Sequence, residues 1–261
     1  MRNETLRELW RYRELLYFFA WRDVKLRYRQ AALGVAWAVI QPLFTMIIFT
    51  LFFGRLAGMP SDGIPYPLFA YCALVPWTYF STVLALAGNS LVSNSSLLTK
   101  IYFPRVLLPA SAAVAGLLDF VVGSLFLVVL MAWYHVRPSW GLLFIPLLVV
   151  LMMLLTTGAG MLLAAVNVRY RDVKYVLPFL IQIWLFATPI IYPVTIIPAR
   201  FRPLLALNPC WGLVDGFRAC IFPNRVVDGN LIAASIAVAL AVFVTGAVYF
   251  HKAQKEFADV I

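Results

Sequence analysis

The sequence predicts an all-α integral membrane protein with six transmembrane helices, and three observations support this prediction. Of the 261 residues, 63% are apolar and only 12% are charged, a composition outside the usual range of soluble domains. The apolar residues form six runs of about the 20 residues that a helix needs to cross a hydrocarbon core of about 30 Å. None of the runs alternates polar and apolar residues as the strands of a membrane β-barrel do. The six runs cover residues 34–53, 67–87, 106–134, 141–166, 175–192 and 231–250.

Residues 1–33 precede the first predicted crossing and have the pattern of an amphipathic helix in the cytoplasmic interface. They contain neither Gly nor Pro, and apolar residues recur at near-helical spacing among charged ones. The segment is too long and too mixed in charge for the n-region of a secretory signal, so we expect it to be retained. Arg22, Lys25 and Arg29 share one helix face. Anchoring to lipid headgroups accounts for this face, and contact with an anionic substrate headgroup at an entrance is the alternative.

The distribution of basic residues predicts the orientation. Lys and Arg number 15 in the N-terminal arm, the C-terminal tail and the two connections on their side, against 6 in the other connections. The positive-inside rule therefore places both termini in the cytoplasm. The net charge of +10 is largely explained by this topology, so we expect membrane lipids and no nucleic acid as partners.

The connection between the second and third predicted crossings should form a short cytoplasmic helix over about residues 95–103. Apolar and aromatic side chains displayed to solvent are typical of a surface that docks a partner. The residues concerned are Leu97, Leu98, Lys100, Ile101, Tyr102 and Phe103. The next cytoplasmic connection repeats the sequence Arg-Asp-Val-Lys, found first at residues 22–25 and again at residues 171–174.

The long external connection, residues 194–230, is rich in proline and contains an apolar stripe at spacings of three and four from Cys210 to Ile221. Asp215 and Arg218 are expected on the opposite, polar face. A helix this short cannot span the bilayer, so we expect it to re-enter the outer leaflet as an external gate. A packed external cap is the alternative. A disulfide between Cys210 and Cys220 is compatible with this placement but is not implied by it.

Motifs for catalysis are missing from the sequence. No Gly-Lys-Ser or Gly-Lys-Thr is present, so there is no Walker A phosphate loop. The two histidines, His135 and His251, lie far apart and form no zinc-protease motif. Support for a stand-alone intramembrane enzyme is therefore weak, and we expect no cofactor in this chain.

Polar side chains within the predicted crossings are few. Asp119 is the single charged candidate, and an intramembrane carboxylate is by default a functional-site hypothesis. A hydrogen bond to a neighbouring helix, or protonation, explains it equally well. Gln41 and Gln182 are two further polar side chains that we expect to be buried. With neighbouring aromatic side chains they could line a path for sugars, whose C–H surfaces pack on aromatic faces. The proposed lining is Tyr28, Trp37, Gln41, Phe44, Tyr175, Gln182, Trp184, Phe186 and Tyr192. Ordinary packing or contact with lipid is the alternative for each of the aromatic residues.

Three stretches carry a resemblance to a known family: RDVKLRYRQAALGVAWAVIQPL, VNVRYRDVKYVLPFLIQIWLFATPIIYP and LNPCWGLVDGFR. Over essentially the whole chain, the sequence resembles the membrane subunit of type-2 ABC exporters that carry O-antigen, capsular polysaccharide or teichoic acid. The resemblance implies a homodimer paired with two copies of a separate nucleotide-binding subunit, which would bind the ATP and magnesium. It also implies a bacterial inner-membrane location, a coupling helix at residues 95–103, and a channel formed mainly by the first and fifth crossings.

From this resemblance we expect export of a polysaccharide on an undecaprenyl diphosphate anchor, with O-antigen as the preferred substrate. Basic residues would attract the diphosphate at the entrance, because charge-assisted contacts to phosphate favour arginine. The entrance residues are Arg22, Lys25, Arg27, Arg29, Arg169 and Arg171. The external gate residues are Pro193, Phe201, Asn208, Pro209, Trp211, Phe217 and Arg218. The alternatives are an exporter of drugs or small lipids, a stand-alone intramembrane enzyme, and a passive structural membrane protein.

Overall fold

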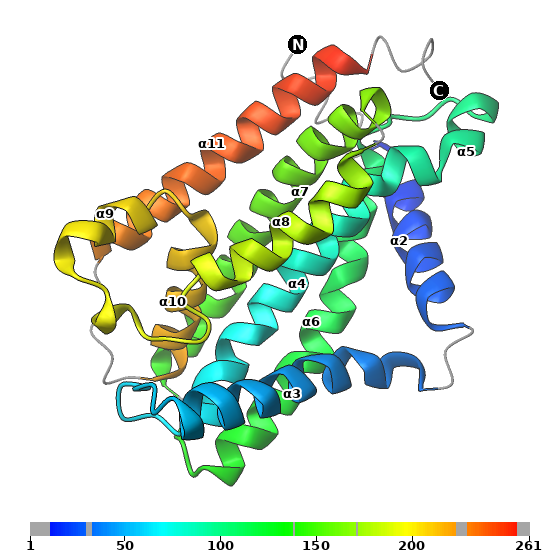
Figure 1. Cartoon of the computed structure of the whole chain (residues 1–261). Helices are drawn as coiled ribbons and strands as arrows, with labels where there is room; N and C mark the ends of the chain where they lie inside the picture. The colour runs from blue at the N-terminus through cyan, green and yellow to red at the C-terminus, as the bar shows by residue number, and fades with distance from the viewer. Residues whose placement is uncertain (1–10, 30–32, 138, 171, 223–228, 255–261) are drawn as a thin grey trace.

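A computed structural model of the chain describes residues 11–29, 33–137, 139–170, 172–222 and 229–254, and all regular secondary structure within these residues is helical. The long helices α4, α6, α7, α8 and α11 run side by side, and α3 crosses the bundle obliquely (Figure 1). The principal helices are α2 (Arg13–Tyr28), α3 (Trp37–Phe49), α4 (Tyr66–Ser93), α5 (Ser95–Lys100), α6 (Leu107–Trp133), α7 (Ile145–Arg169), α8 (Val173–Ala187), α9 (Arg202–Leu205), α10 (Pro209–Ile221) and α11 (Gly229–Ala253). The shorter turns are η1 (Gly34–Ala36), η2 (Thr50–Leu56), η3 (Trp140–Phe144), η4 (Val194–Ile196) and η5 (Ala199–Phe201).

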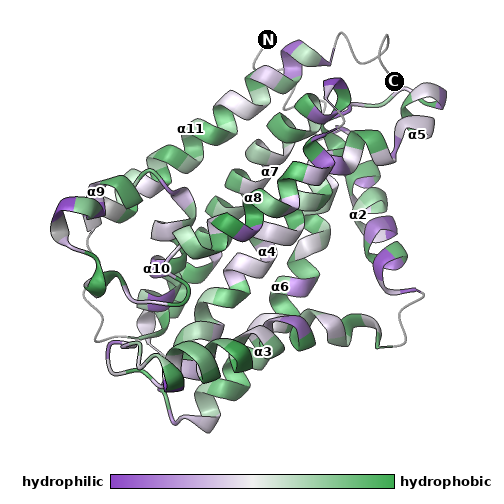
Figure 2. Cartoon of the chain, viewed as in Figure 1, coloured by the Kyte–Doolittle hydropathy of each residue, from purple (hydrophilic) through white to green (hydrophobic). Residues whose placement is uncertain are grey.

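Five helical stretches are long and apolar enough to cross a membrane, and they match five of the six predicted crossings. They are Gly34–Leu56, Tyr66–Ser93, Leu107–Trp133, Trp140–Arg169 and Ile232–Ala253. Figure 2 shows hydrophobic residues along the long helices and hydrophilic residues on much of α2. The chain is therefore a multi-pass, all-helical membrane protein.

The remaining predicted crossing, residues 175–192, corresponds to α8, which has 15 residues and ends at Ala187. At 1.5 Å per residue α8 is about 22 Å long, shorter than a typical span. Thr188 has extended backbone angles because the residue before a proline, here Pro189, is disfavoured in the helical region. The expected extension to residue 192 is thus replaced by turns, and a sixth crossing stays a prediction.

Helix α4 forms the centre of the bundle. Within its most apolar window 78% of the residues are buried, and α3, α6, α7, α8 and α10 all contact it. Small residues allow the helices around α4 to approach closely, as is common in membrane bundles. A Cβ atom on Gly160 of α7 would lie 2.5 Å from Ala87 of α4. A Cβ atom on Gly246 of α11 would lie 2.0 Å from the carbonyl oxygen of Gly158 in α7.

A second apolar cluster ties together the beginning of α2, helix α5, the beginning of α6 and the ends of α7 and α11. Its buried members include Phe19, Leu91, Phe103, Val168 and Phe250. Helix α5 therefore lies at the same end of the bundle as the beginning of α2 and the end of α11, as Figure 1 shows. Helix α10 and turn η3 pack together at the other end.

Candidate functional site

The first feature of the candidate site is a charged cluster between α2 and α6. Helix α2 packs along α6, and the Arg27 guanidinium forms a salt bridge with the Asp119 carboxylate. The Tyr28 hydroxyl donates a hydrogen bond to the other oxygen of Asp119. Burial, and then the hydrogen bond to Asp119, raise the pKa of Tyr28 to about 12, so the phenol remains a proton donor at physiological pH. Asp119 is thus hydrogen-bonded to the neighbouring helix α2. A bond of this kind was one of the explanations for an intramembrane carboxylate that the sequence left open.

A groove of about 480 Å³ lies beside this cluster, between α2, α4 and α6. Its polar lining consists of Asp23, Arg27, Asn89, Ser90 and Ser93. The carboxylate of Asp23 accepts hydrogen bonds from Arg22, at 2.8 Å, and from the Ser111 hydroxyl, at 3.1 Å. Asn89, Ser90 and Ser93 of α4 are not among the predicted site residues, although the unusual polar stretch from Gly88 to Ser96 marks them in the sequence. The groove thus combines amide, hydroxyl and charged groups next to apolar side chains.

The six predicted entrance residues fall into two groups. Arg22 and Arg27 are half-buried and already paired with carboxylates of this chain. Lys25, Arg29 and Arg169 are exposed, and Arg169 lies at the end of α7 with its guanidinium 5.7 Å from the ring of Tyr170. Arg171 lies outside the described residues. The structure therefore brings Arg27 to the groove and leaves Lys25 and Arg29 exposed along the same helix.

Helices α3 and α8 expose much of their apolar surface. In the window of the α3 stretch only 17% of the residues are buried, and Leu177 is the only buried residue of α8. Six of the predicted channel residues are exposed on these two helices: Trp37, Gln41, Phe44, Tyr175, Gln182 and Phe186. The expectation that Gln41 and Gln182 are buried is therefore wrong for the single chain. Both side chains are exposed because α3 and α8 have few neighbouring helices at these positions.

The other three predicted channel residues, Tyr28, Trp184 and Tyr192, make contacts within the chain. Tyr28 is held by Asp119. Trp184 packs edge-on against Phe80 of α4, and its indole N–H donates to Asn208 at 2.8 Å. Tyr192 lies after α8, and its hydroxyl donates to the Phe186 carbonyl at 3.0 Å. Tyr28 and Trp184 thus connect α2 and α8, respectively, to other parts of the chain, whereas Tyr192 bonds back to α8.

Asn208 connects the end of α8 to the beginning of α10. Its side-chain oxygen caps α10 by accepting from the backbone N–H of Cys210 at 3.1 Å, in a position where asparagine is a favoured cap. Its amide donates to the Thr188 hydroxyl at 3.0 Å. Pro209 follows at the first helical position, where the missing N–H costs nothing. The predicted short helix is thus confirmed over Pro209–Ile221.

The polar face predicted for α10 is wrong, because Arg218 is fully buried and Asp215 is nearly so. The Arg218 guanidinium donates to the carbonyl oxygens of Ile190, at 2.7 Å, Phe69, at 3.3 Å, and Pro189. It also lies 3.7 Å from the centre of the Phe69 ring. The carbonyl oxygens in the turn after α8 have no N–H partner within a helix, and Arg218 donates hydrogen bonds to them. The spacing of residues in α10 alone could not indicate this contact.

The other predicted gate residues lie at different depths. Trp211 and Phe217 are buried in α10, and Pro193 is buried in the turns after α8, whereas Phe201 is exposed. Cys210 and Cys220 are both free and buried, so no disulfide joins them here.

Helix α5 is shorter than predicted and ends at Lys100. Ile101 is extended, and Phe103 is restricted by the proline that follows it. Of the predicted docking residues, Lys100, Ile101 and Tyr102 are exposed, and Tyr102 is 94% exposed. Leu97, Leu98 and Phe103 instead pack into the apolar cluster at this end of the bundle, so only part of the predicted docking surface is available.

These features define an all-helical, multi-pass membrane protein with exposed apolar helices. Within the described residues, no group of three or more His, Cys, Asp or Glu side chains could hold a metal ion. Residues 14–222 match the family described as ABC-2 type transporter. The chain belongs to the ABC-2 type transporter family. It is 33% identical to the O-antigen export system permease protein RfbA of Myxococcus xanthus over 259 residues, 98% of each chain.

Two further relatives show how far the similarity extends. The chain is 26% identical to the O-antigen export system permease protein RfbA of Klebsiella pneumoniae, over 95% of each chain. It is 24% identical to the polysialic acid transport protein KpsM of Escherichia coli, over 80% of this chain and 81% of that protein. The similarity therefore covers the bundle, the groove and the α9–α10 segment together.

Proposed function

We propose that this chain is the transmembrane subunit of an ABC exporter of polysaccharide in the bacterial inner membrane, with O-antigen as the substrate. The observation that supports this most directly is the similarity to O-antigen export permeases over 98% of the chain. Subunits of the ABC-2 family transport their substrate, and ATP is hydrolysed on a separate ATPase. The chain is thus a permease and not an enzyme, and ATP and magnesium belong to its partner.

The functional unit in this proposal is a homodimer joined through α3 and α8. Both helices present apolar surface that no other helix covers within the part of the chain that the structure describes, and a two-fold axis would let each copy cover the other. The exposed aromatic and glutamine side chains of these helices would then line the path between subunits. Aromatic faces pack on sugar C–H surfaces, and glutamine amides hydrogen-bond to hydroxyl groups.

The substrate's undecaprenyl diphosphate enters, in this proposal, beside α2. Lys25 and Arg29 are exposed there and carry charge that a diphosphate attracts. Arg27 is paired with Asp119, so its first role is to hold α2 on α6. Arg169, at the end of α7, supplies a further exposed positive charge.

We place α5, both termini and the ATPase on the cytoplasmic side. The packing of α5 with the beginning of α2 and the end of α11 puts these three segments at one end, and the excess of basic residues orients that end inward. Lys100, Ile101 and Tyr102 form the docking contact. At the other end, α9 and α10 form the external gate.

The test is to co-purify the chain in mild detergent with its ATPase partner, and to measure ATP hydrolysis in proteoliposomes with and without undecaprenyl-linked glycan. We expect a stable complex whose ATPase rate changes with the glycan. A complex that responds only to small amphiphiles would indicate an exporter of drugs or small lipids. A chain that purifies alone and acts on lipid without an ATPase would refute the transport proposal.

A further inference from the structure

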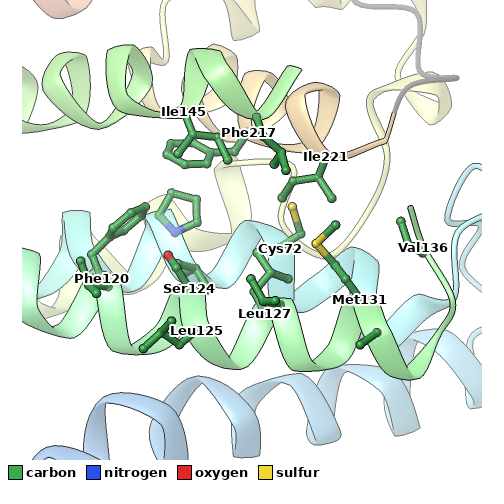
Figure 3. Close-up of a pocket in the computed structure, with 16 residues that line it drawn as sticks. Cys72, Phe120, Ser124, Leu125, Leu127, Met131, Val136, Ile145, Phe217 and Ile221 are labelled. Atoms are coloured by element: carbon green, nitrogen blue, oxygen red, sulfur yellow. The ribbon is translucent and has the colours of Figure 1, made fainter. Parts of the chain in front are cut away.

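An apolar pocket lies between α6 and the α7–α10 region, at the end of the bundle away from α5. Its volume is about 560 Å³, within the range of small-molecule sites. In Figure 3, Phe120, Ser124, Leu127 and Met131 follow α6 along one wall, and Ile145, Phe217 and Ile221 face them. Among the lining residues Ser124 alone carries a side-chain hydroxyl. A lining this apolar offers water too few hydrogen-bond partners, so it favours an apolar occupant.

The pocket opens on the surface that faces the lipid. Val121, Leu125 and Val128 belong to its lining and are between 53% and 62% exposed. They lie on α6, which is apolar and long enough to cross the membrane. The pocket is therefore continuous with the protein–lipid interface, and hydrocarbon chains are the molecules that reach its opening.

The length and direction of the pocket match one leaflet of the bilayer. Its lining extends along α6 from Phe120 to Ala132, thirteen residues that rise about 18 Å, close to the roughly 15 Å of half a hydrocarbon core. Trp133 and Trp140, which flank its end, are 78% and 87% exposed. Tryptophan concentrates at the depth of lipid headgroups, so the pocket runs from headgroup depth toward the membrane centre.

We propose that this pocket binds one acyl chain of a bilayer phospholipid, with the glycerol next to Val136 and the methyl end next to Phe120. The chain would lie against Phe217 and Ile221 of α10, so the lipid would fill the space between α6 and the gate helix. The ring of Phe217 already contacts that of Phe120 edge-on, at 5.8 Å between centroids. This site is separate from the groove beside α2 and needs only the membrane location of α6.

The first test uses the wild-type chain in its complex with the ATPase, reconstituted with phosphatidylethanolamine that carries a photoactivatable diazirine at a chosen depth in one acyl chain. Labelled peptides are mapped by mass spectrometry. A diazirine near the glycerol should label Ala132 and Val136, and one near the methyl end should label Phe120 and Ser124. Labelling should decrease when unlabelled phosphatidylethanolamine is added. A labelling pattern without this depth order would overturn the proposal.

The second test fills the pocket with Ser124→Phe and compares it with Val129→Phe, which adds the same side chain at an exposed α6 position outside the lining. We expect loss of labelling in S124F and normal labelling in V129F. Equal labelling in the two variants would refute the site. Competition by undecaprenyl phosphate but not by phosphatidylethanolamine would show that the pocket takes the substrate's lipid instead, and the proposal would be wrong. Because labelling does not depend on export, failure here would leave the transport proposal untouched.

Discussion

The cluster of Asp119, Arg27 and Tyr28 gives the sharpest prediction about stability. Asp119→Leu removes the carboxylate and leaves the half-buried Arg27 guanidinium, 23% exposed, without its partner. Breaking a buried ion pair from one side typically costs about 3–5 kcal/mol. Since 1 kcal/mol corresponds to roughly 2–4 °C for a chain of this size, the Tm should fall by about 6–20 °C.

Replacing all three polar side chains of the cluster with apolar ones should restore the Tm that Asp119→Leu lowers. The triple variant Arg27→Met, Tyr28→Phe, Asp119→Leu leaves no buried group unpaired in the cluster, and such apolar replacements are often neutral or stabilising. Arg22→Met is the matched control, because Arg22 and Asp23 are adjacent residues of α2 and the Asp23 carboxylate keeps its hydrogen bond from the Ser111 hydroxyl. Loss of such a partly exposed pair should cost about 0–1 kcal/mol. The assay is thermal unfolding of the purified ATPase complex followed by size-exclusion fluorescence. A triple variant as unstable as Asp119→Leu, or an Asp119→Leu chain as stable as wild type, would refute the reasoning.

Three further predictions concern α10, α5 and the α7–α11 contact. Arg218→Met leaves the Pro189 and Ile190 carbonyls after α8 without their donor. The free energy of unfolding should therefore fall by about 2–6 kcal/mol, and an unchanged Tm would contradict the role given to the guanidinium. Ile101→Glu should abolish export and ATPase coupling while the Tm of the isolated chain stays the same, and preserved glycan-stimulated ATPase activity would rule out this docking surface. Gly246→Ala places a methyl group 2.0 Å from the Gly158 carbonyl, so expression and Tm should fall, whereas Gly229→Ala enters open space and should change neither.

The sequence predicts the long helices well because each crossing is an uninterrupted apolar run, and the bilayer allows few other structures for such a run. It locates helix ends less well where a proline intervenes. Pro189 ends α8 early, and the proline after Phe103 shortens the segment around α5. Both effects depend on the residue before the proline, a local signal that hydropathy does not contain.

Side-chain partners far apart in the chain could not be predicted. Asp119 stands out in the sequence as the single intramembrane carboxylate, but its partner Arg27 lies 92 positions away, among several arginines that look alike. Arg218 has helical spacing that suggests a polar face. Its burial follows from carbonyls exposed by a turn in another part of the chain. In the proposed homodimer a second copy covers the exposed surfaces of α3 and α8, and the pattern of a single chain does not specify that contact.

The uneven packing between helices divides the molecule into parts that are held together with different tightness. Helices α4, α7 and α11 are joined by glycine contacts with no spare room, so a relative shift of these helices would break close packing. The α3 stretch and α8 make few contacts within the chain, so moving them costs little apolar burial, and mobile elements are generally drawn from such weakly held segments. Since α8 is tied to α10 through Asn208 and Arg218, a displacement of its end would be transmitted to α10 as well. In the proposed homodimer, widening the path between the subunits would then require no repacking of the centre of either one.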